Sequence, residues 1–422
     1  MLSSPEERKR QRQAKAAERA EKQKKSMRLR IAAAGVILLA CGVLIFSLSR
    51  NQPHGDISGT ETSQQTEQTQ DTTAEATKPA ATTIHYVAVG DLNVNDATVA
   101  AGGTGYVYTD AFIDVAHLLA DADISSVNFE GNLNGEPYGS SFSAPVSMAT
   151  ALQKAGVDLV QMANSYSINQ GLSGLTASID AIRSTGMEPL GVYASNAEFK
   201  AQKGYTIRTV QGVKMAFVAF TKGMDGMALP AGSENCVNVL YSDYDSVYQN
   251  VDTEKITGIL SAVAKEKPDV TIALLHWGSE FNNTISSSQE KIVSLMQANG
   301  VDAIIGTHSH YVQKMTFDQE KGQFVAYSLG DFFSNAERSG SEYSVVLDLE
   351  ITKDNRTGQT KITNYAYTPI FTVHEAEKPL RVVRIQEAVE AYQSGFIQKV
   401  APETYEKMLY ALGRIESRVK GE

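Results

Sequence analysis

Seven apolar runs of strand length alternate with amphipathic helical patterns in this 422-residue chain. The runs span residues 84–91, 124–129, 159–162, 214–220, 270–275, 303–305 and 324–328. Helical patterns with polar starts or glycine ends fall at residues 111–120, 149–156, 172–185, 254–265 and 286–298. Strands that alternate with helices predict a layered α/β fold, in which the residues after each strand meet at the carboxyl edge of a sheet, where ligands bind.

The N-terminal segment predicts a membrane anchor. Residues 1–30 hold eleven Lys/Arg and four Asp/Glu, whereas residues 31–49 carry no charge. At 1.5 Å per residue a helix over residues 31–49 covers about 29 Å, the thickness of the hydrocarbon core. The basic flank predicts a cytoplasmic N-terminus and an extracytoplasmic C-terminal domain in a single-pass cell-membrane protein. A cleaved lipoprotein signal ending near Cys41 is the competing interpretation.

The remaining chain divides into three parts. Residues 50–82 are polar, without apolar periodicity, and predict a disordered linker. Residues 83–375 hold the α/β pattern, and residues 376–422 predict a helical tail with helices near 383–400 and 402–419. The basic segment contributes +7 to a total charge of −10, so the rest of the chain carries −17, which argues against nucleic acid as a partner. Cys236 is the only cysteine after the predicted span, so no disulfide is available there.

Five polar residues at or near the ends of strands could bind a metal. They are Asp91, Glu130, His276, His308 and His310. Each one alone is more simply a helix cap, a loop residue or a hydrogen-bonded histidine. Together they form a mixed oxygen and nitrogen set that suits one or two Mn, Zn or Fe ions, and a carboxylate can bridge two ions. The shared placement therefore favours a divalent-metal site.

The same residues lie within motifs that resemble a known family. The ordered motifs are Val89-Gly90-Asp91, Val127-Asn128-Phe129-Glu130, Ala163-Asn164, His276-Trp277-Gly278-Ser279-Glu280, residues 306–313 around His308 and His310, and Tyr327-Ser328-Leu329-Gly330-Asp331-Phe332. Over about residues 84–372 the chain resembles the CapA family of poly-gamma-glutamate capsule biosynthesis proteins, relatives of the calcineurin-like metallophosphoesterases. The resemblance implies a four-layer α/β/β/α sandwich behind a transmembrane helix.

The resemblance also implies roles for individual residues. Asp91, Glu130 and His310 would bind one ion, with Asn93 as a candidate further ligand, and Glu130, His276 and His308 would bind a second ion. Asn164 is retained as a candidate catalytic residue, and Glu280 of the His-Trp-Gly-x-Glu motif is a further candidate at the site.

The chain departs from the family pattern at residues that bear on chemistry. Ser165 stands where the family has an Asn ligand, and Tyr166 stands where it has a His that serves as the general acid. A hydroxyl is a poorer ligand than an amide carbonyl, and a phenol with a pKa near 10 donates a proton poorly at neutral pH. Asn169 replaces an Asp, and Asp331 replaces an Asn and adds a carboxylate. The catalytic half of the site is thus predicted to be degenerate.

Three hypotheses follow. The first is a membrane-anchored CapA-like protein that acts in synthesis or export of an anionic cell-surface polymer, together with that polymer or its membrane synthase complex, and has reduced or lost catalysis. The second is an active extracytoplasmic phosphoesterase or related hydrolase that depends on a divalent metal. The third is a metal-free binding module. Ser165 and Tyr166 favour the first over the second, and the retained histidines His276, His308 and His310 favour both over the third.

Overall fold

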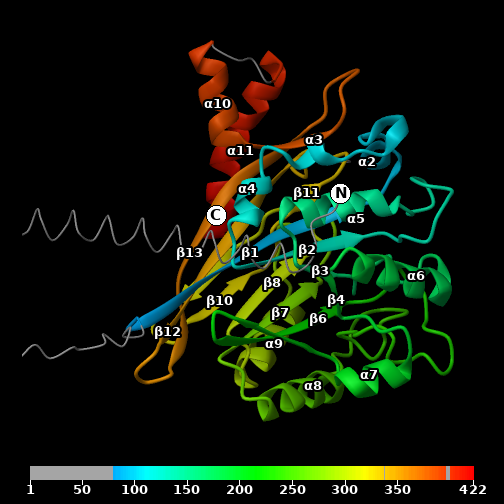
Figure 1. Cartoon of the computed structure of the whole chain (residues 1–422), viewed down its shortest axis with the longest axis vertical. Coiled ribbons are helices and arrows are strands. Elements are labelled where there is room, and N and C mark those ends of the chain that lie inside the picture. Colours follow the sequence, from blue (N-terminus) through cyan, green and yellow to red (C-terminus); the bar gives the residue numbers. More distant parts are fainter. Residues whose placement is uncertain (1–78, 337, 396–399) are drawn as a thin grey trace, which may run out of the picture. The chain divides into compact units, whose positions relative to one another are not determined.

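A computed structural model describes residues 79–336, 338–395 and 400–422 as one compact unit (Figure 1). The predicted basic segment and span, residues 1–49, lie outside these described residues, as does most of the predicted linker. Within the described ranges, no helix is both long and apolar enough to cross a bilayer.

The first sheet has eight strands. Its order is β14 (Arg381–Arg384), β13 (Thr360–Val373), β12 (Tyr343–Asp354), β1 (Ala81–Asn93), β2 (Ile124–Glu130), β3 (Leu159–Gln161) and β4 (Glu188–Leu190), and β11 (Asp331–Phe333) also pairs with β1. Strands β1 to β4 and β11 are parallel, whereas β12, β13 and β14 join antiparallel. The carboxyl ends of β1 and β2 therefore point to the same edge of the sheet.

The second sheet has six strands. Its order is β5 (Thr206–Val210), β6 (Val213–Thr221), β7 (Val270–His276), β8 (Ala303–Thr307), β10 (Gln323–Ala326) and β9 (Met315–Asp318). Strands β6, β7, β8 and β10 are parallel, and β5 and β9 close the two edges antiparallel. The predicted runs 214–220, 270–275 and 303–305 thus lie side by side in the centre of this sheet.

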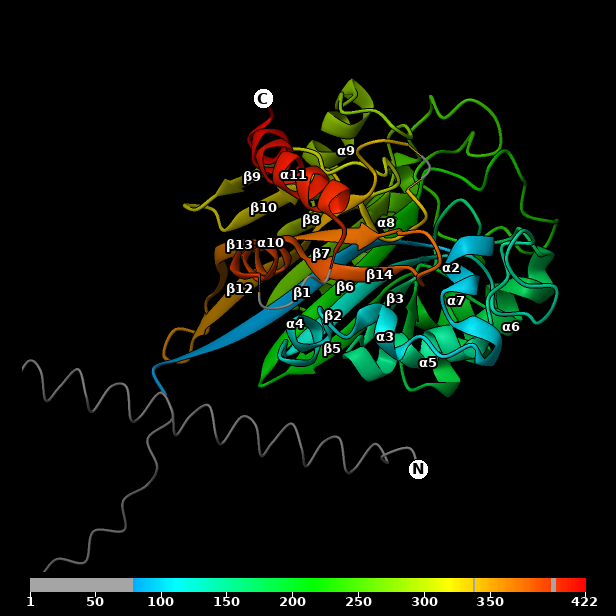
Figure 2. The ribbon, with the colours of Figure 1, turned by 90° about the horizontal axis from the view of Figure 1, so that it is seen from above.

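Helices cover the outer faces of the two sheets (Figure 2). Those of the N-terminal half are α2 (Asp96–Ala100), the 3-10 turn η1 (Gly103–Gly105), α3 (Thr109–Phe112), α4 (Ala116–Ala120), α5 (Val146–Ala155), α6 (Gly171–Ser184) and α7 (Asn196–Gln202). On the second sheet they are α8 (Thr253–Lys265) and α9 (Ser287–Ala298), and two C-terminal helices, α10 (Ile385–Ser394) and α11 (Pro402–Lys420), follow β14. Local sequence sets where two of these helices begin or end. Ser286 and Gln289 form a capping box at the start of α9, and Gly156 ends α5 with a φ of 114°.

The period-two alternation of strand residues produces three apolar layers. Along β1, Val87 and Val89 pack towards α3, α5 and α6, whereas Tyr86 and Ala88 pack between the two sheets. Along β6, Phe217 faces the first sheet, and its neighbours pack towards α8 and α9. The layers therefore run helices, sheet, sheet, helices, and the predicted α/β class is confirmed.

Three boundaries differ from the sequence predictions. Strand β1 begins at Ala81, inside the predicted linker, because residues 81 and 82 pair with Asp354 and Lys353 of β12. The predicted tail is not entirely helical: β14 extends the first sheet before α10 begins. The predicted helix 111–120 is broken into α3 and α4, because hydrogen bonds spanning three residues link Phe112, Val115 and Leu118.

The C-terminal helices pack on the first sheet. Helices α10 and α11 contact each other and β13, and α11 also contacts β12 (Figure 1). Met408, Ala411 and Ile415 of α11 are fully buried in the same apolar cluster as the residues between the sheets. The C-terminal helices therefore contribute to the apolar core.

Candidate metal centre

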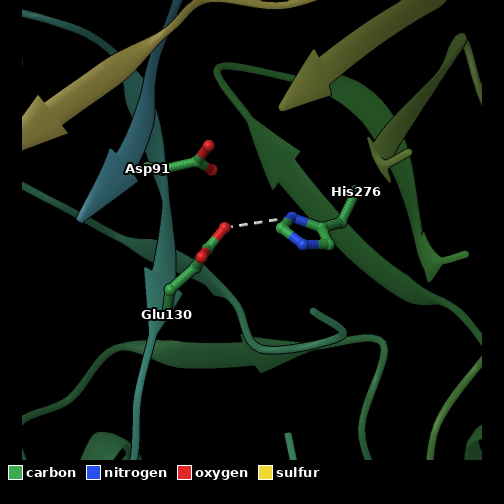
Figure 3. Close-up of side chains that lie close together, drawn as sticks. All are labelled: Asp91, Glu130 and His276. Carbon is green, nitrogen blue, oxygen red and sulfur yellow. Dashed lines mark ion pairs between the residues drawn. The ribbon is translucent and has the colours of Figure 1, made fainter. Parts of the chain in front are cut away.

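Polar side chains from both sheets converge at the carboxyl ends of their parallel strands. Asp91 lies near the end of β1, Glu130 ends β2 and His276 ends β7, and Figure 3 shows their side chains pointing towards one another. One potential ligand atom from each residue lies within 4.8 Å of the other two, and all three residues are buried. Three buried ligand atoms at this spacing can surround one cation.

A second group of potential ligands shares Asp91. Asp91, His310 and Asp331 also bring ligand atoms within 4.8 Å of one another. Strand β11 places Asp331 directly opposite Asp91, and the Asp91 amide donates to the carbonyl of Gly330 at 3.1 Å. The chains approach so closely that a Cβ on Gly90 would lie 1.7 Å from that carbonyl oxygen, which explains glycine at this position. Asp91 can therefore bridge two sites.

Asn128 organises the carboxyl groups. Its side-chain amide nitrogen donates to Asp91 Oδ1 at 2.6 Å and to Glu130 Oε1 at 3.1 Å. Its amide oxygen accepts a hydrogen bond from Asn164 Nδ2 at 3.1 Å, and Asn164 also donates to the backbone carbonyl of Phe129 at 2.7 Å. Asn164 thus fixes the position of Asn128, which in turn orients Asp91 and Glu130. Asn164 therefore supports the candidate ligands through Asn128.

Both ring nitrogens of His276 have neighbours. Nδ1 lies 3.2 Å from Glu130 Oε1 and 3.3 Å from Thr307 Oγ1, and Nε2 lies 3.1 Å from the hydroxyl oxygen of Ser165. Burial, followed by the charges of His310 and Lys222, holds the pKa of His276 well below its ordinary value. The contact with Glu130 in Figure 3 is therefore made by a neutral imidazole, the form that binds metal.

His308 provides the clearest test of whether these residues fit a metal. Its side chain is 2% exposed, and neither Nδ1 nor Nε2 has a hydrogen-bond partner. Its backbone amide donates to Asp91 Oδ2 at 2.9 Å, and its ring centroid lies 4.4 Å from that of His276. Burying a polar group without a partner costs roughly 1–3 kcal/mol. A cation bound by the imidazole removes this cost, so the residues present fit a divalent metal.

The pKa values of the buried carboxyl groups also favour a metal site. Burial, with the nearby charge of Asp331, raises the pKa of Asp91 to about 6. Burial, with the nearby charge of Asp91, raises the pKa of Glu130 well above its ordinary value. Carboxyl groups at this distance repel each other when ionised, and a divalent cation between them relieves the repulsion. Binding of a divalent cation would therefore displace protons from Asp91 and Glu130.

His310 is held differently from the other two histidines. Its Nδ1 lies 2.8 Å from Asp331 Oδ1, and its ring stacks on Phe281 with centroids 4.8 Å apart. Burial lowers the pKa of His310, but the charges of Asp331, Glu130 and Asp91 outweigh it, and the pKa lies well above the ordinary value. Without metal, His310 and Asp331 therefore form an ion pair, and Nε2 of His310 remains the nitrogen free of that contact.

A cleft opens beside the cluster. Its lining includes His310 and Asp331 of the cluster, the candidate residues Asn93, Tyr166 and Glu280, and the aromatic rings of Phe142 and Phe281. The ring of Tyr166 stacks on Phe142 with centroids 4.4 Å apart. A molecule in this cleft would contact Tyr166 and the His310 side of the cluster together.

The structure brings most of the predicted residues together. Asp91, Glu130, His276, His308, His310, Asp331 and Ser165 form the cluster, whereas Asn93, Tyr166 and Glu280 line the adjacent cleft. Sequence reasoning did not single out Asn128, Thr307 or Lys222. Thr307 ends β8, Lys222 directly follows β6 and Asn128 lies two residues before the end of β2, and this position near a strand terminus is the signal that could have found them.

The fold and the cluster together define a mixed α/β protein with potential metal ligands at the carboxyl edges of two facing sheets. The family model described as bacterial capsule synthesis protein PGA_cap matches residues 85–336. The chain belongs to this family, and the resemblance predicted from its motifs is confirmed.

Relatives and solved structures extend the comparison. The chain is similar to the capsule biosynthesis protein CapA of Bacillus anthracis, with 26% identity over 269 residues, which cover 60% of each chain. It is also similar to the PGA biosynthesis protein CapA of Bacillus subtilis strain 168, with 24% identity over 225 residues, which cover 53% of each chain. The alignments thus span little more than half of these relatives.

Among solved structures, the calcineurin-like phosphoesterase YfkN of Bacillus subtilis matches with a TM-score of 0.42 and 16% identity, covering 79% of this chain and 99% of the other. A phosphatase of Mycoplasma pneumoniae matches with a TM-score of 0.42 and 14% identity, covering 69% of this chain and 94% of the other.

Proposed function

We propose that this chain is a membrane-anchored, extracytoplasmic protein of capsule polymer synthesis or export that binds divalent metal and has weakened hydrolytic chemistry. The buried cluster of Asp91, Glu130 and Asp331 with three histidines carries the proposal, above all the unpartnered imidazole of His308. Membership of the capsule synthesis family supports the biological role.

The proposed ligands form two groups that share Asp91. Glu130, His276 and His308 stand on one side of it, and His310 and Asp331 stand on the other. A bound divalent ion supplies a Lewis acid that polarises a phosphoryl or carbonyl oxygen. Asp331 replaces an Asn of the family motif, and its carboxylate adds negative charge beside Asp91 and His310. The mixed oxygen and nitrogen donors suit Mn, Zn or Fe.

The weakened chemistry follows from Ser165 and Tyr166. Ser165 offers a hydroxyl beside His276 where the family resemblance implies an amide ligand. Tyr166 lines the cleft at the position of the implied general acid, and a phenol of ordinary pKa near 10 is a poor proton donor at neutral pH. Losing a general acid removes roughly a hundred- to ten-thousand-fold in rate.

The membrane anchor and the polymer belong to the same proposal. Residues 31–49 would span the membrane and place residues 79–422 outside it, next to a synthase complex in that membrane. The two CapA relatives are named for capsule and PGA biosynthesis, and this supports an anionic cell-surface polymer such as poly-gamma-glutamate.

Metal analysis of the purified full chain tests the proposal. We expect one or two Mn, Zn or Fe ions per chain, loss of metal in His308→Ala, and no loss in the control His374→Ala, whose side chain is exposed. We also expect the wild-type chain, but not His308→Ala, to restore surface polymer to a host strain lacking the gene. A metal-free wild-type chain would refute the metal site. Rapid turnover of a generic phosphodiester would favour the active phosphoesterase instead.

A further inference from the structure

Lys222 follows β6 directly and lies at the same sheet edge as the metal cluster. Its backbone amide donates to the carbonyl of His276 at 2.8 Å, so the two residues are neighbours across adjacent strands. Its ammonium group donates to the carbonyl of Gly278 at 3.1 Å and lies 4.9 Å from the centroid of the Tyr248 ring. The side chain is thereby held beside the cluster.

The charge of Lys222 is not matched by a direct partner. Glu280 and Asp225 are the acidic groups whose charges reach it, but no carboxylate among the described residues forms an ion pair with its Nζ. Its charge does reach the imidazoles of His276 and His308, where it disfavours protonation. An ammonium has three donors, and Gly278 accepts from one of them.

We propose that Lys222 binds an oxyanion, a phosphate or a carboxylate group, of the molecule that enters the metal centre. The argument rests on geometry: a partly buried cation on a residue whose backbone is bonded to the candidate ligand His276, with spare donors and no ion pair among the described residues. A lysine ammonium binds such groups as a point charge, and partial burial strengthens the attraction. Lys222 would thus hold one charged end of the substrate at the centre. This inference deepens the proposed function and rests on it.

A purely structural role is the competing explanation. Lys222 could serve only to hold the segment after His276, through Gly278 and the Tyr248 ring. That role predicts an effect of Lys222 on folding stability and metal content, without a separate effect on anion binding. Lys255 provides a matched control, because its ammonium also contacts backbone carbonyls, those of Glu234 and Val237, and an aromatic ring, that of Phe199. It is remote from the cluster and lies on α8.

The experiment is a calorimetric titration of the metal-loaded full chain in detergent with inorganic phosphate and, separately, with glutarate. We expect Lys222→Met to weaken binding of at least one anion about tenfold or more, at unchanged metal content and thermal midpoint, and Lys255→Met to leave binding unchanged. The anion that loses affinity identifies the substrate group as a phosphate or a carboxylate.

Other outcomes overturn the proposal. Equal anion affinity in the wild type and Lys222→Met would do so, as would no binding of either anion to the metal-loaded wild type. Loss of metal in Lys222→Met, or equal weakening in Lys255→Met, would assign Lys222 a structural role instead. A wild-type chain without metal would refute the proposed function, and the same titration on that metal-free chain would still decide whether Lys222 binds anions.

Discussion

The hydroxyl oxygen of Ser165 lies 3.1 Å from Nε2 of His276, at the buried edge where the two sheets meet. The other nitrogen of this imidazole, Nδ1, faces Glu130 and Thr307, so Ser165 contacts the ring on the side away from Glu130. Ser165 also precedes Tyr166, whose ring lines the cleft. Two of the four departures from the pattern that the family resemblance implies are therefore adjacent in the chain and lie at or beside this centre.

We predict that the double substitution Ser165→Asn, Tyr166→His creates or increases phosphoesterase activity. The asparagine would add an amide ligand, and the histidine would supply a proton donor with a pKa near neutrality. We expect a gain of about a hundredfold or more in turnover of bis(p-nitrophenyl) phosphate with added manganese.

The single substitution Ser165→Ala is the control for this gain. It removes the hydroxyl beside His276 without adding a ligand or an acid, so activity should stay at the wild-type level. Unchanged activity in a double variant that folds and binds metal would show that other residues silence the site.

We predict that Asn128→Ala weakens metal binding more than its effect on folding explains. The substitution leaves Asp91 and Glu130 without their shared donor, so both carboxyl groups lose their fixed orientation. Loss of such a supporting contact typically costs about 10- to 100-fold in metal affinity. Isothermal titration with manganese measures the change.

Asn238→Ala is the matched control for Asn128→Ala. Asn238 is also fully buried and donates to the carbonyls of Gly204 and Ala219, away from the metal cluster. Both variants should lose roughly 1–3 kcal/mol of unfolding free energy. Equal metal affinity in the two variants would contradict the organising role of Asn128.

Metal affinity is predicted to fall as the pH falls through about 6. Asp91 binds metal as the carboxylate, and its raised pKa of about 6 means that protons compete for it below that value. Glu130, whose pKa is also raised, contributes in the same direction. Binding should therefore release protons near neutral pH.

Titrations with manganese at pH 7.5 and 5.5, in buffers of different ionisation enthalpy, measure both effects. We expect at least tenfold weaker binding at pH 5.5 and a net release of protons at pH 7.5. An affinity independent of pH across this window would exclude Asp91 and Glu130 as ligands.

Arg418 is predicted to support the centre from the C-terminal helix α11. Its buried guanidinium lies 4.5 Å from the Tyr311 ring centroid and 5.1 Å from that of Tyr343, and it donates to the carbonyl of Gly340. Tyr311 follows His310 directly. We expect Arg418→Met to lower the unfolding free energy by about 1–3 kcal/mol and to weaken metal binding, as His310 loses support.

Urea unfolding and manganese titration of Arg418→Met check this prediction. Lys420→Met serves as the control, because Lys420 is exposed on the same helix and its partner is Glu416. A variant of Arg418 with lower stability but wild-type metal affinity would limit α11 to a packing role.

Much of the parallel core was predictable from the sequence. The runs that became β2, β7 and β8 are continuously apolar, as strands buried on both faces must be, and their boundaries differ from the predictions by two residues or fewer. The antiparallel strands β12 and β13 were not predicted. Their residues alternate between buried and partly buried positions over long stretches, and charged side chains interrupt the apolar pattern.

The candidate ligands could be selected from the sequence because each lies at or near a strand terminus, and the family model confirms the membership that their motifs predicted. The sequence did not indicate how Asp331 relates to Asp91. The two are 240 positions apart in the chain, and only the pairing of β11 with β1 places them opposite each other.

The sequence by itself determined the α/β alternation, the strand termini and the residue types available to bind metal, because periodicity and polarity are local properties. The tertiary structure alone decided that Asn128 joins Asp91 to Glu130, that Ser165 faces His276 and that the His308 imidazole is left without a hydrogen bond. These contacts depend on the order of the strands within each sheet and on which faces of the two sheets pack together. Strand order is set by packing between distant segments, and no local pattern records it.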